Sequence, residues 1–400
     1  MPTQMTEFIL QREKLEQAAA ILNELQTDAW LIFARETEET PERTWELLAP
    51  GGVVWQSVLL LTPRGDRLVI IGEGDAATYR QCGLYSEVHG YTTGMRELLA
   101  RTLTRLNPDQ VAINFSKSNS AADGLTHGMY LTLLEYLEGT PYRDRLVTAD
   151  PIISRLRGRK TAAEVARIRA AVDRTIGLFD EVSRTIKVGI TEKAIAQYLQ
   201  KRLDELDLAP AWELSGCPIV NTGPLSSAGH STPSELQVEP GHLVHLDFGV
   251  KENGYCSDLQ RMWYVLRPNE TEPPSTVQRA FNAVLKTIQE SAKILKPGIE
   301  GWQVDARARE VLTGEGYPEY QHALGHQVGR AVHDGSTLLG PRWERYGDTP
   351  YGTVEEHQVY TLELGVTTEA GYLGLEEDVL VTATGVEWLS PPQTELWLVP

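Results

Sequence analysis

The stretch Val244-His-Leu-Asp-Phe-Gly-Val250 is typical of a β-strand, because β-branched and other apolar residues dominate it, yet the acid Asp247 stands in its middle. A turn at Glu252-Asn-Gly254 follows, and then a second apolar run, Met262-Trp-Tyr-Val265. Asp258 lies between the turn and that second run. If the two strands pair across the turn, both carboxylates converge on one patch of a sheet. The segment therefore predicts a β-sheet that carries an acidic site.

Two more acids occupy strand-like runs near the C-terminus. Glu363 lies within Tyr360-Thr-Leu-Glu-Leu-Gly365, and Glu376 precedes Asp378-Val-Leu-Val-Thr382. One such acid alone is best explained as a salt-bridged or sheet-edge carboxylate. Four together differ, because two carboxylates about 4 Å apart repel by about 4 kcal/mol at an effective dielectric of about 20. Two divalent cations would neutralise the four charges, and carboxylate ligands favour manganese, magnesium or cobalt over soft metals.

The run His322-Ala-Leu-Gly-His326-Gln-Val-Gly-Arg-Ala-Val-His333 holds three histidines. It fits neither an amphipathic helix nor a strand, so burial in the core explains these histidines poorly. His230 lies in a loop rich in Gly, Ser and Pro, where binding residues are common. We take this run and His230 as site candidates. His245 shares a strand face with Asp247, but no pattern supports a contact between them. We expect the remaining histidines to be structural: His89, His127, His242, His245 and His357.

The overall composition excludes several classes of protein. Of the 400 residues, 41% are hydrophobic and 23% are charged, a globular balance rather than a disordered one. The net charge of −18 argues against nucleic acid and anionic membranes as partners. The cysteines are too few and too widely spaced for a disulfide framework or a thiolate zinc site. With neither a signal-peptide pattern at the N-terminus nor an apolar run long enough for a membrane span, we expect a cytoplasmic protein.

The order of predicted elements indicates two domains. Strand and helix signals alternate over the first 150 residues, which predicts an α/β domain. A basic break containing Pro and Gly spans residues 150–160, and the capping-box pattern Thr161-Ala-Ala-Glu164 then opens a long helix. We place the boundary there, with domains at 1–155 and 156–400. Helices are expected in the second domain near 161–186, 191–207, 275–295 and 302–314, segregated from strands in an α+β arrangement.

Together these motifs resemble a known family of enzymes, the metallopeptidase family M24 with the pita-bread fold. That family includes prolidases, which are Xaa-Pro dipeptidases, and also Xaa-Pro aminopeptidases and methionine aminopeptidases. The α/β domain ahead of residue 156 is similar to the N-terminal domain of the prolidase and creatinase branch. The resemblance rests on five segments: Asp247-Phe-Gly249, Ser257-Asp-Leu-Gln-Arg261, the histidine run at 322–329, Leu362-Glu-Leu-Gly365 and Glu376-Glu-Asp-Val-Leu-Val381.

The resemblance implies a centre of two divalent metal ions. Asp247 would chelate one ion, and His326 with Glu363 would hold the other. Asp258 and Glu376 would bridge both ions. A water molecule between the metals would be the nucleophile, because two cations lower its pKa. Manganese is the first choice of metal, with cobalt or zinc as alternatives.

The resemblance also implies roles around the metals. Glu363 would act as a catalytic residue that moves a proton to the leaving nitrogen. His230 and His333 would be catalytic and substrate-binding residues that orient the scissile peptide and stabilise the oxyanion. Arg345 matches an arginine that some prolidases use to bind the C-terminal carboxylate of the substrate. A homodimer is also implied.

Three residues depart from the usual pattern of the family. Gln260 stands where Thr is usual, and Leu364 replaces a common Pro. Gly374 stands where prolidases usually have an arginine two residues before the last metal-binding Glu. The loss of that arginine removes a bidentate donor for carboxylates, which bears on dipeptide specificity.

We therefore expect a prolidase-like dipeptidase that hydrolyses short proline-containing peptides. An Xaa-Pro aminopeptidase is the first alternative, and a non-proline dipeptidase or another metal-dependent enzyme on the same scaffold is the next. A metal-free hydrolase of the creatinase type and a non-catalytic binding scaffold are disfavoured, because all five ligand positions are filled by ligating residues.

Overall fold

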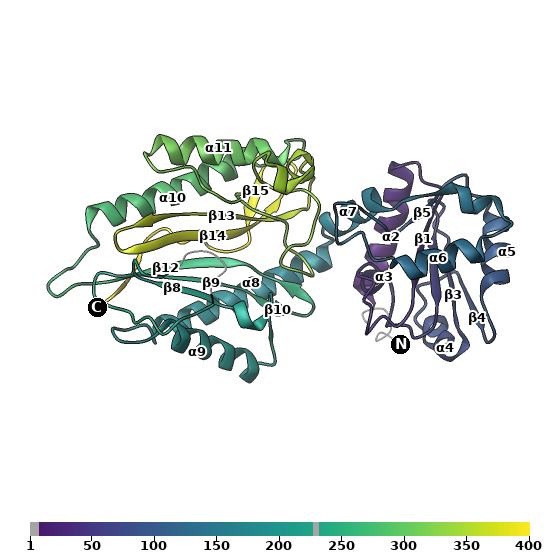
Figure 1. The fold of residues 1–400 in the computed structure, drawn as a ribbon, viewed down its shortest axis with the longest axis horizontal. Coiled ribbons are helices and arrows are strands. Elements are labelled where there is room, and N and C mark those ends of the chain that lie inside the picture. The colour runs from purple at the N-terminus through teal and green to yellow at the C-terminus, as the bar shows by residue number, and fades with distance from the viewer. Residues whose placement is uncertain (1–7, 227–231) are drawn as a thin grey trace. The chain divides into compact units, whose positions relative to one another are not determined.

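The computed structural model describes residues 8–226 and 232–400. Contacts divide the chain into two compact units, Met1–Arg157 and Gly158–Pro400 (Figure 1). Each unit has a β-sheet and a hydrophobic core of its own. No described helix combines the length and the apolar character that crossing a lipid bilayer requires.

The described part of the first unit is a mixed β-sheet with helices on both faces. Its strand order is β4-β3-β2-β1-β5-β6. The strands are β1 (Ala29–Ala34), β2 (Ser57–Leu61), β3 (Arg67–Gly72), β4 (Glu87–Tyr91), β5 (Val111–Ile113) and β6 (Leu146–Thr148). The helices are α2 (Ile9–Glu24), α3 (Trp45–Leu48), α4 (Glu73–Gln81), α5 (Arg96–Leu106), α6 (His127–Tyr136), the 3-10 turn η1 (Pro141–Arg145) and α7 (Asp150–Gly158).

Alternation along the central strand β1 builds two separate cores. Trp30 and Ile32 belong to a cluster with residues of α2, α3, α4 and α7. Leu31 and Phe33 belong to a second cluster with residues of α5 and α6. Since successive side chains of a strand point to opposite faces, the sheet is covered on both sides. The expected α/β domain is confirmed.

The segment after β6 corrects one expectation. Residues 150–158, which the sequence suggested to be a break, form helix α7. Pro151 is tolerated because it stands in the first turn, where a missing N–H breaks no helical hydrogen bond. The predicted capping box does open α8 (Ala162–Ser183): Thr161 Oγ1 accepts from the Glu164 N–H, and the Glu164 carboxylate accepts from the Thr161 N–H at 2.8 Å.

The second unit is α+β, as expected, and its larger sheet has the path β13-β14-β12-β9-β8. The strands of that path are β8 (Ile219–Thr222), β9 (Leu243–Phe248), β12 (Leu259–Val265), β13 (Val359–Thr368) and β14 (Gly371–Val381). Strand β15 (Val386–Trp388) joins β14, and β16 (Trp397–Val399) joins β12. A small sheet holds β7 (Ala209–Pro210), β10 (Val250–Glu252) and β11 (Tyr255–Cys256).

Helices flank the larger sheet. Figure 1 shows α10 (Ser275–Ile294) and α11 (Gly301–Gly314) beside β13 and β14, and α8 with α9 (Glu192–Glu205) beside β8 to β10. Leu362 and Leu364 of β13 pack in one core cluster with residues of α10 and α11. Phe179 of α8 contacts Phe248 of β9, with ring centroids 6.0 Å apart. Short 3-10 turns complete the unit: η2 (Leu214–Gly216), η3 (Glu344–Tyr346) and η4 (Thr349–Tyr351).

Candidate metal centre

One row of residues crosses four strands of the larger sheet. Asp247 on β9 is paired with Gln260 on β12, Gln260 with Glu376 on β14, and Glu376 with Glu363 on β13. Residues that lie opposite each other on neighbouring strands point to the same face. We call Asp247, Gln260, Glu376 and Glu363 the acidic row. Its face is opposite to the core of α10 and α11, because Leu362 and Leu364 on either side of Glu363 point into that core.

Asp258 joins this face from the residue just before β12. It is two positions before Gln260, so the alternation of the strand places it on the same side. Its N–H donates to Asp378 Oδ2 at 3.1 Å, which fixes the backbone there. The pairing of β9 with β12 that the sequence predicted is therefore present, and it brings the carboxylates of Asp247 and Asp258 together.

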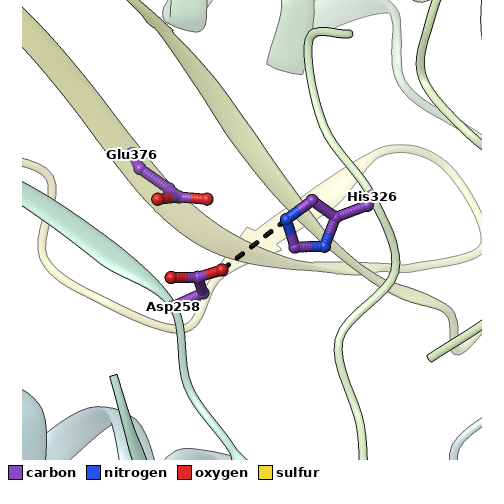
Figure 2. Close-up of side chains that lie close together, drawn as sticks. All are labelled: Asp258, His326 and Glu376. Carbon is purple, nitrogen blue, oxygen red and sulfur yellow. Dashed lines mark ion pairs between the residues drawn. The ribbon is translucent and has the colours of Figure 1, made fainter. Parts of the chain in front are cut away.

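His326 completes the cluster. Its Nε2 lies 3.6 Å from Asp258 Oδ2 and 3.7 Å from Glu363 Oε1. Asp258, His326 and Glu376 each offer one ligand atom, and these atoms lie within 4.8 Å of one another. Figure 2 shows the three side chains converging on one point from three separate segments. Such an arrangement can hold a metal ion.

The segment around His326 runs beside β13. Thr361 donates its N–H to the His326 carbonyl at 2.9 Å, and the Thr361 hydroxyl oxygen accepts from the His326 N–H at 3.1 Å. A Cβ at Gly325 would lie 2.0 Å from the Thr361 carbonyl oxygen. Only glycine allows this approach, which explains why the histidine run is interrupted by glycine. Burial, and then the neighbouring His333, lower the pKa of His326 to about 3, so its imidazole is neutral and able to ligate.

The electrostatics of the cluster are unbalanced. Within residues 8–226 and 232–400, the carboxylates of Asp247, Asp258, Glu363 and Glu376 form no ion pair with Lys or Arg. Burial raises the pKa of Asp247 to about 7 and that of Glu363 to about 8. Burial, followed by repulsion from the neighbouring carboxylates, raises the pKa values of Asp258 and Glu376 well above the ordinary range. Divalent cations would relieve this repulsion and take the place of the protons.

The hydrogen bonding of the cluster fits a metal site. Asp247 Oδ1, Asp258 Oδ1 and Glu376 Oε1 are buried and lack a hydrogen-bond partner among the described residues. Buried polar atoms without a partner are costly, so oxygens left open in one cluster indicate a ligand. Carboxylate oxygens with one imidazole suit manganese, cobalt or zinc. The residues present therefore fit a divalent cation.

His333 lies beside His326, with ring centroids 4.2 Å apart and the rings nearly perpendicular. The next residue, Asp334, anchors the loop: it is buried, and its Oδ2 accepts from the Arg330 N–H at 2.7 Å and lies 3.9 Å from Lys160 Nζ. The structure thus places His333 beside His326. The anchoring ion pair was not foreseen, because nothing in the sequence relates residue 160 to residue 334.

His230 lies outside the described residues, within 227–231. The ends of its loop are tied to one carboxylate: Glu192 of α9 accepts from the Thr222 N–H at 2.8 Å and from the Ser234 N–H at 2.9 Å. Glu192 is buried, and sequence reasoning missed it because it appears simply as an acid in the first turn of a helix.

Arg345 is the predicted residue that the structure does not bring to the acidic row. It lines a cleft of about 630 Å³ together with Gln321, His322 and Trp343. Its guanidinium stacks 4.8 Å from the centroid of the Trp343 ring and 4.9 Å from that of Tyr346, and it donates to the Gln321 carbonyl. The ring of His322 lies 5.4 Å from that of Tyr320.

The three departures from the family pattern have different places. Leu364 is buried in the core with α10 and faces away from the acidic row. Gln260 lies within the row itself and hydrogen-bonds two of its acids. Gly374 lies on β14 next to Gln260 and Tyr372.

Comparison with known proteins points to one family of enzymes. The model of metallopeptidase family M24 matches residues 166–383, which include every predicted metal ligand. An uncharacterised peptidase of Staphylococcus haemolyticus is 24% identical over 335 residues, 83% of this chain and 87% of that protein. One of Staphylococcus saprophyticus is 26% identical over 388 residues, 94% of this chain and 99% of that protein.

Solved structures with the same fold cover almost the whole chain. An Xaa-Pro dipeptidase from Bacillus anthracis has a TM-score of 0.73 at 23% identity, covering 97% of this chain and 100% of that one. An X-Pro aminopeptidase from Thermotoga maritima has a TM-score of 0.73 at 24% identity, covering 95% and 100%. A prolidase from Pyrococcus horikoshii has a TM-score of 0.67 at 22% identity, covering 96% and 99%. At this identity the likeness shows the fold, which confirms the expected α/β unit followed by a pita-bread unit.

Proposed function

This chain belongs to metallopeptidase family M24, and from that premise we propose that it hydrolyses short peptides at Xaa-Pro bonds with two divalent metal ions. The observation that carries the proposal is the buried acidic row, whose carboxylates converge with His326 and form no ion pair with Lys or Arg among the described residues. Metal-dependent peptide hydrolysis is the chemistry that such a centre supports.

We propose that five side chains hold the two cations. Asp247 would bind one, His326 and Glu363 the other, and Asp258 and Glu376 would bridge both. The positions of these residues on one face of the sheet support the assignment, as do the three ligand atoms within 4.8 Å. When bound, the cations would activate a water molecule for attack and polarise the peptide carbonyl. Manganese is the metal we propose first, with cobalt or zinc as alternatives.

The chain's own residues would then manage the proton and the developing charge. The Glu363 carboxylate would take a proton from the attacking water and pass it to the amide nitrogen as the C–N bond breaks. His333, beside His326, would donate to the carbonyl oxygen as that oxygen becomes negative. His230 would share this role from the neighbouring loop. These roles require only that Glu363, His333 and His230 lie next to the metal ligands.

Arg345 supports a preference for short peptides, whose C-terminal carboxylate lies close to the bond that is cleaved. Its guanidinium contacts two aromatic rings at a cleft, and no ion pair joins it to an acid in the described part of the chain. Arginine binds carboxylates through two parallel hydrogen bonds. We propose that it receives the C-terminal carboxylate of a dipeptide, since Gly374 offers no guanidinium.

Two alternatives have support of their own. The X-Pro aminopeptidase from Thermotoga maritima matches the fold as well as the Xaa-Pro dipeptidase does, at a TM-score of 0.73 for each. The glycine at 374 keeps open a dipeptidase that does not require proline. A non-catalytic scaffold has no comparable support, because every ligand position carries a ligating residue.

Release of alanine from Ala-Pro and from a longer peptide that begins Ala-Pro tests the proposal, because hydrolysis of the Ala–Pro bond frees alanine from both substrates. The enzyme would be stripped with a chelator and assayed before and after Mn²⁺ is added, with Glu376→Ala as the inactive control. Manganese-dependent cleavage of the dipeptide alone supports the dipeptidase. Cleavage of only the longer peptide identifies an aminopeptidase, and cleavage of neither by protein with two bound metals refutes the Xaa-Pro substrate.

We also propose that the chain forms a homodimer. Light scattering coupled to gel filtration would then give about twice the chain mass of 44.5 kDa. A mass equal to one chain at micromolar concentration would contradict this part of the proposal.

A further inference from the structure

Gln260 is the neutral member of the acidic row, and it bonds to two of the acids. Its Nε2 donates to Glu376 Oε2 at 3.0 Å and to Glu363 Oε2 at 3.2 Å. The side chain is buried, with 4% of its surface exposed. The NH₂ group of one amide thus donates hydrogen bonds to two carboxylates on different strands.

The two carboxylates keep their other oxygens for a different partner. Glu376 Oε1 is buried without a hydrogen-bond partner among the described residues, and Glu363 Oε1 faces His326 Nε2 at 3.7 Å. Gln260 therefore binds one oxygen of each acid and leaves the other oxygen turned toward the cluster. A neutral donor can do this without cancelling the negative charge that attracts a cation.

A buried histidine contacts the other edge of the amide. His245 Nε2 lies 2.8 Å from Gln260 Oε1, and Nδ1 lies 3.0 Å from the carboxamide of Asn221. Carboxylates only accept, so the NH₂ edge of Gln260 faces Glu363 and Glu376, and its carbonyl oxygen is left to accept from the His245 Nε2–H. The His245 ring is itself packed edge-on against Tyr372, with centroids 4.9 Å apart.

Glycine at 374 leaves the room that this arrangement needs. A Cβ at Gly374 would lie 2.6 Å from Gln260 Oε1 and 2.7 Å from Tyr372 Cε1. Both distances are too short for real contacts, so a side chain at 374 and the present position of Gln260 exclude each other. Two of the three departures from the family pattern, Gln260 and Gly374, therefore belong to one arrangement.

We propose that Gln260, oriented by His245, is a positioning residue that holds Glu363 and Glu376 in the geometry required for metal binding. The inference rests on the metal centre proposed above and extends it to residues that would touch neither metal nor substrate. Outer partners of metal ligands are typically worth about 10- to 100-fold in metal affinity. We expect an effect of that size for Gln260.

The test is a titration of chelator-stripped protein with Mn²⁺, in which electron paramagnetic resonance measures the free ion. Gln260→Met keeps the length of the side chain and removes both donors. Gln393→Met is the matched control: Gln393 is also buried, and its amide bonds the backbone of Met262 on the same strand β12. We expect about 10- to 100-fold weaker Mn²⁺ binding in Gln260→Met and an unchanged affinity in Gln393→Met.

A second pair of variants tests the role of His245. His245→Phe retains a ring against Tyr372 and removes the donor to Gln260, so we expect a smaller loss of affinity in the same direction. The double variant with Gln260→Met should bind no more weakly than Gln260→Met alone, because His245 acts through the amide. If Gln260→Met does not fold, Gly374→Ala serves instead, since its methyl group displaces the amide from its place.

The outcomes separate this inference from the proposed function. Affinity of Gln260→Met within twofold of Gln393→Met, with normal binding by the unaltered protein, overturns the role of Gln260 and leaves the metal centre standing. If the losses of Mn²⁺ affinity add in the double variant, His245 does not act through Gln260, and that part of the inference is overturned. Failure of the unaltered protein to bind Mn²⁺, cobalt or zinc overturns both proposals, whatever peptides it cleaves.

Discussion

Strands β12 and β14 contribute to two buried sets of polar side chains on opposite faces of the sheet. In only one of the two sets is a negative charge paired with a positive one. On one face lies the acidic row, with Gln260 and Glu376. The next residue on each strand, Arg261 and Glu377, points to the other face and forms a buried pair with two hydrogen bonds of 3.0 Å. The Glu377 carboxylate also accepts from the Gln393 N–H at 2.9 Å.

The difference shows which charges serve the fold and which serve a ligand. The pair of Arg261 and Glu377 has its charge and its hydrogen bonds satisfied within the chain, as buried ions that stabilise structure must. One residue before Glu377 on the same strand, the acidic row leaves Glu376 Oε1 buried without a hydrogen-bond partner in the described part of the chain. The same backbone thus supplies a closed ion pair on one side and an open set of ligands on the other. Four predictions test this contrast.

The largest effect is expected from Glu376→Gln. The variant keeps the shape of the side chain and removes a charge from the open face, so we expect kcat/KM to fall by about 10³-fold or more, as losing several kcal/mol of metal assistance implies. The thermal stability of the metal-free protein should not fall, because one repulsive charge has gone. Glu356→Gln, at an exposed acid, is the control. A metal-free variant much less stable than the parent would contradict this account.

The opposite result is expected from Glu377→Gln on the closed face. Leaving Arg261 buried without its partner should lower the free energy of unfolding by about 3–5 kcal/mol, measured by denaturant titration. The folded fraction should keep its metal and its activity. The double variant Arg261→Met/Glu377→Leu should recover most of the stability, since no unpaired charge remains. Loss of activity without loss of stability would place Glu377 in the site and end the contrast.

The third prediction concerns pH in the absence of metal. The raised pKa values of Asp247, about 7, and Glu363, about 8, mean that the folded protein binds protons which the unfolded chain has released above about pH 4. Stability of metal-free protein should therefore fall as pH rises from about 5 to 8. Mn²⁺ should remove this fall, because cations replace the protons. Melting temperatures across that range, with and without Mn²⁺, give the answer. A metal-free protein that gains stability over this interval would refute the electrostatic picture.

The acidic row was easier to predict from the sequence than the buried pair of Arg261 and Glu377 on the opposite face. Asp247 and Glu363 stand within apolar strand patterns, and a polar residue in such a place is visible without any structure. Arg261 and Glu377 follow polar residues in the sequence, so nothing distinguishes them. Their pairing depends on the register of β12 with β14, and more than a hundred residues separate the two strands.

The supports of the site were hidden for the same reason. His245 was expected to be structural, and its bond to Gln260 appears only when β9 and β12 pair. Lys160 pairs with Asp334, which is far from it in the sequence. Glu192 likewise accepts hydrogen bonds from Thr222 and Ser234. Local patterns predict strands and unusual residues, whereas contacts between distant segments require the fold.

The smallest effect is expected from Arg345→Ala. This variant extends the comparison of paired and unpaired charges to the residue proposed to bind the substrate. Arg345 is exposed at its cleft and stacks on Trp343 and Tyr346, whereas Arg261 is buried against a carboxylate. If Arg345 binds the C-terminal carboxylate of a dipeptide, its loss should raise KM for Ala-Pro by about tenfold, the equivalent of about 1.4 kcal/mol, and leave kcat unchanged. Arg342→Ala is the matched control, since that exposed guanidinium stacks on Trp302 at 4.2 Å outside the residues that line the cleft. Equal KM values for the two variants would remove Arg345 from substrate binding and leave the substrate carboxylate to be bound by another group.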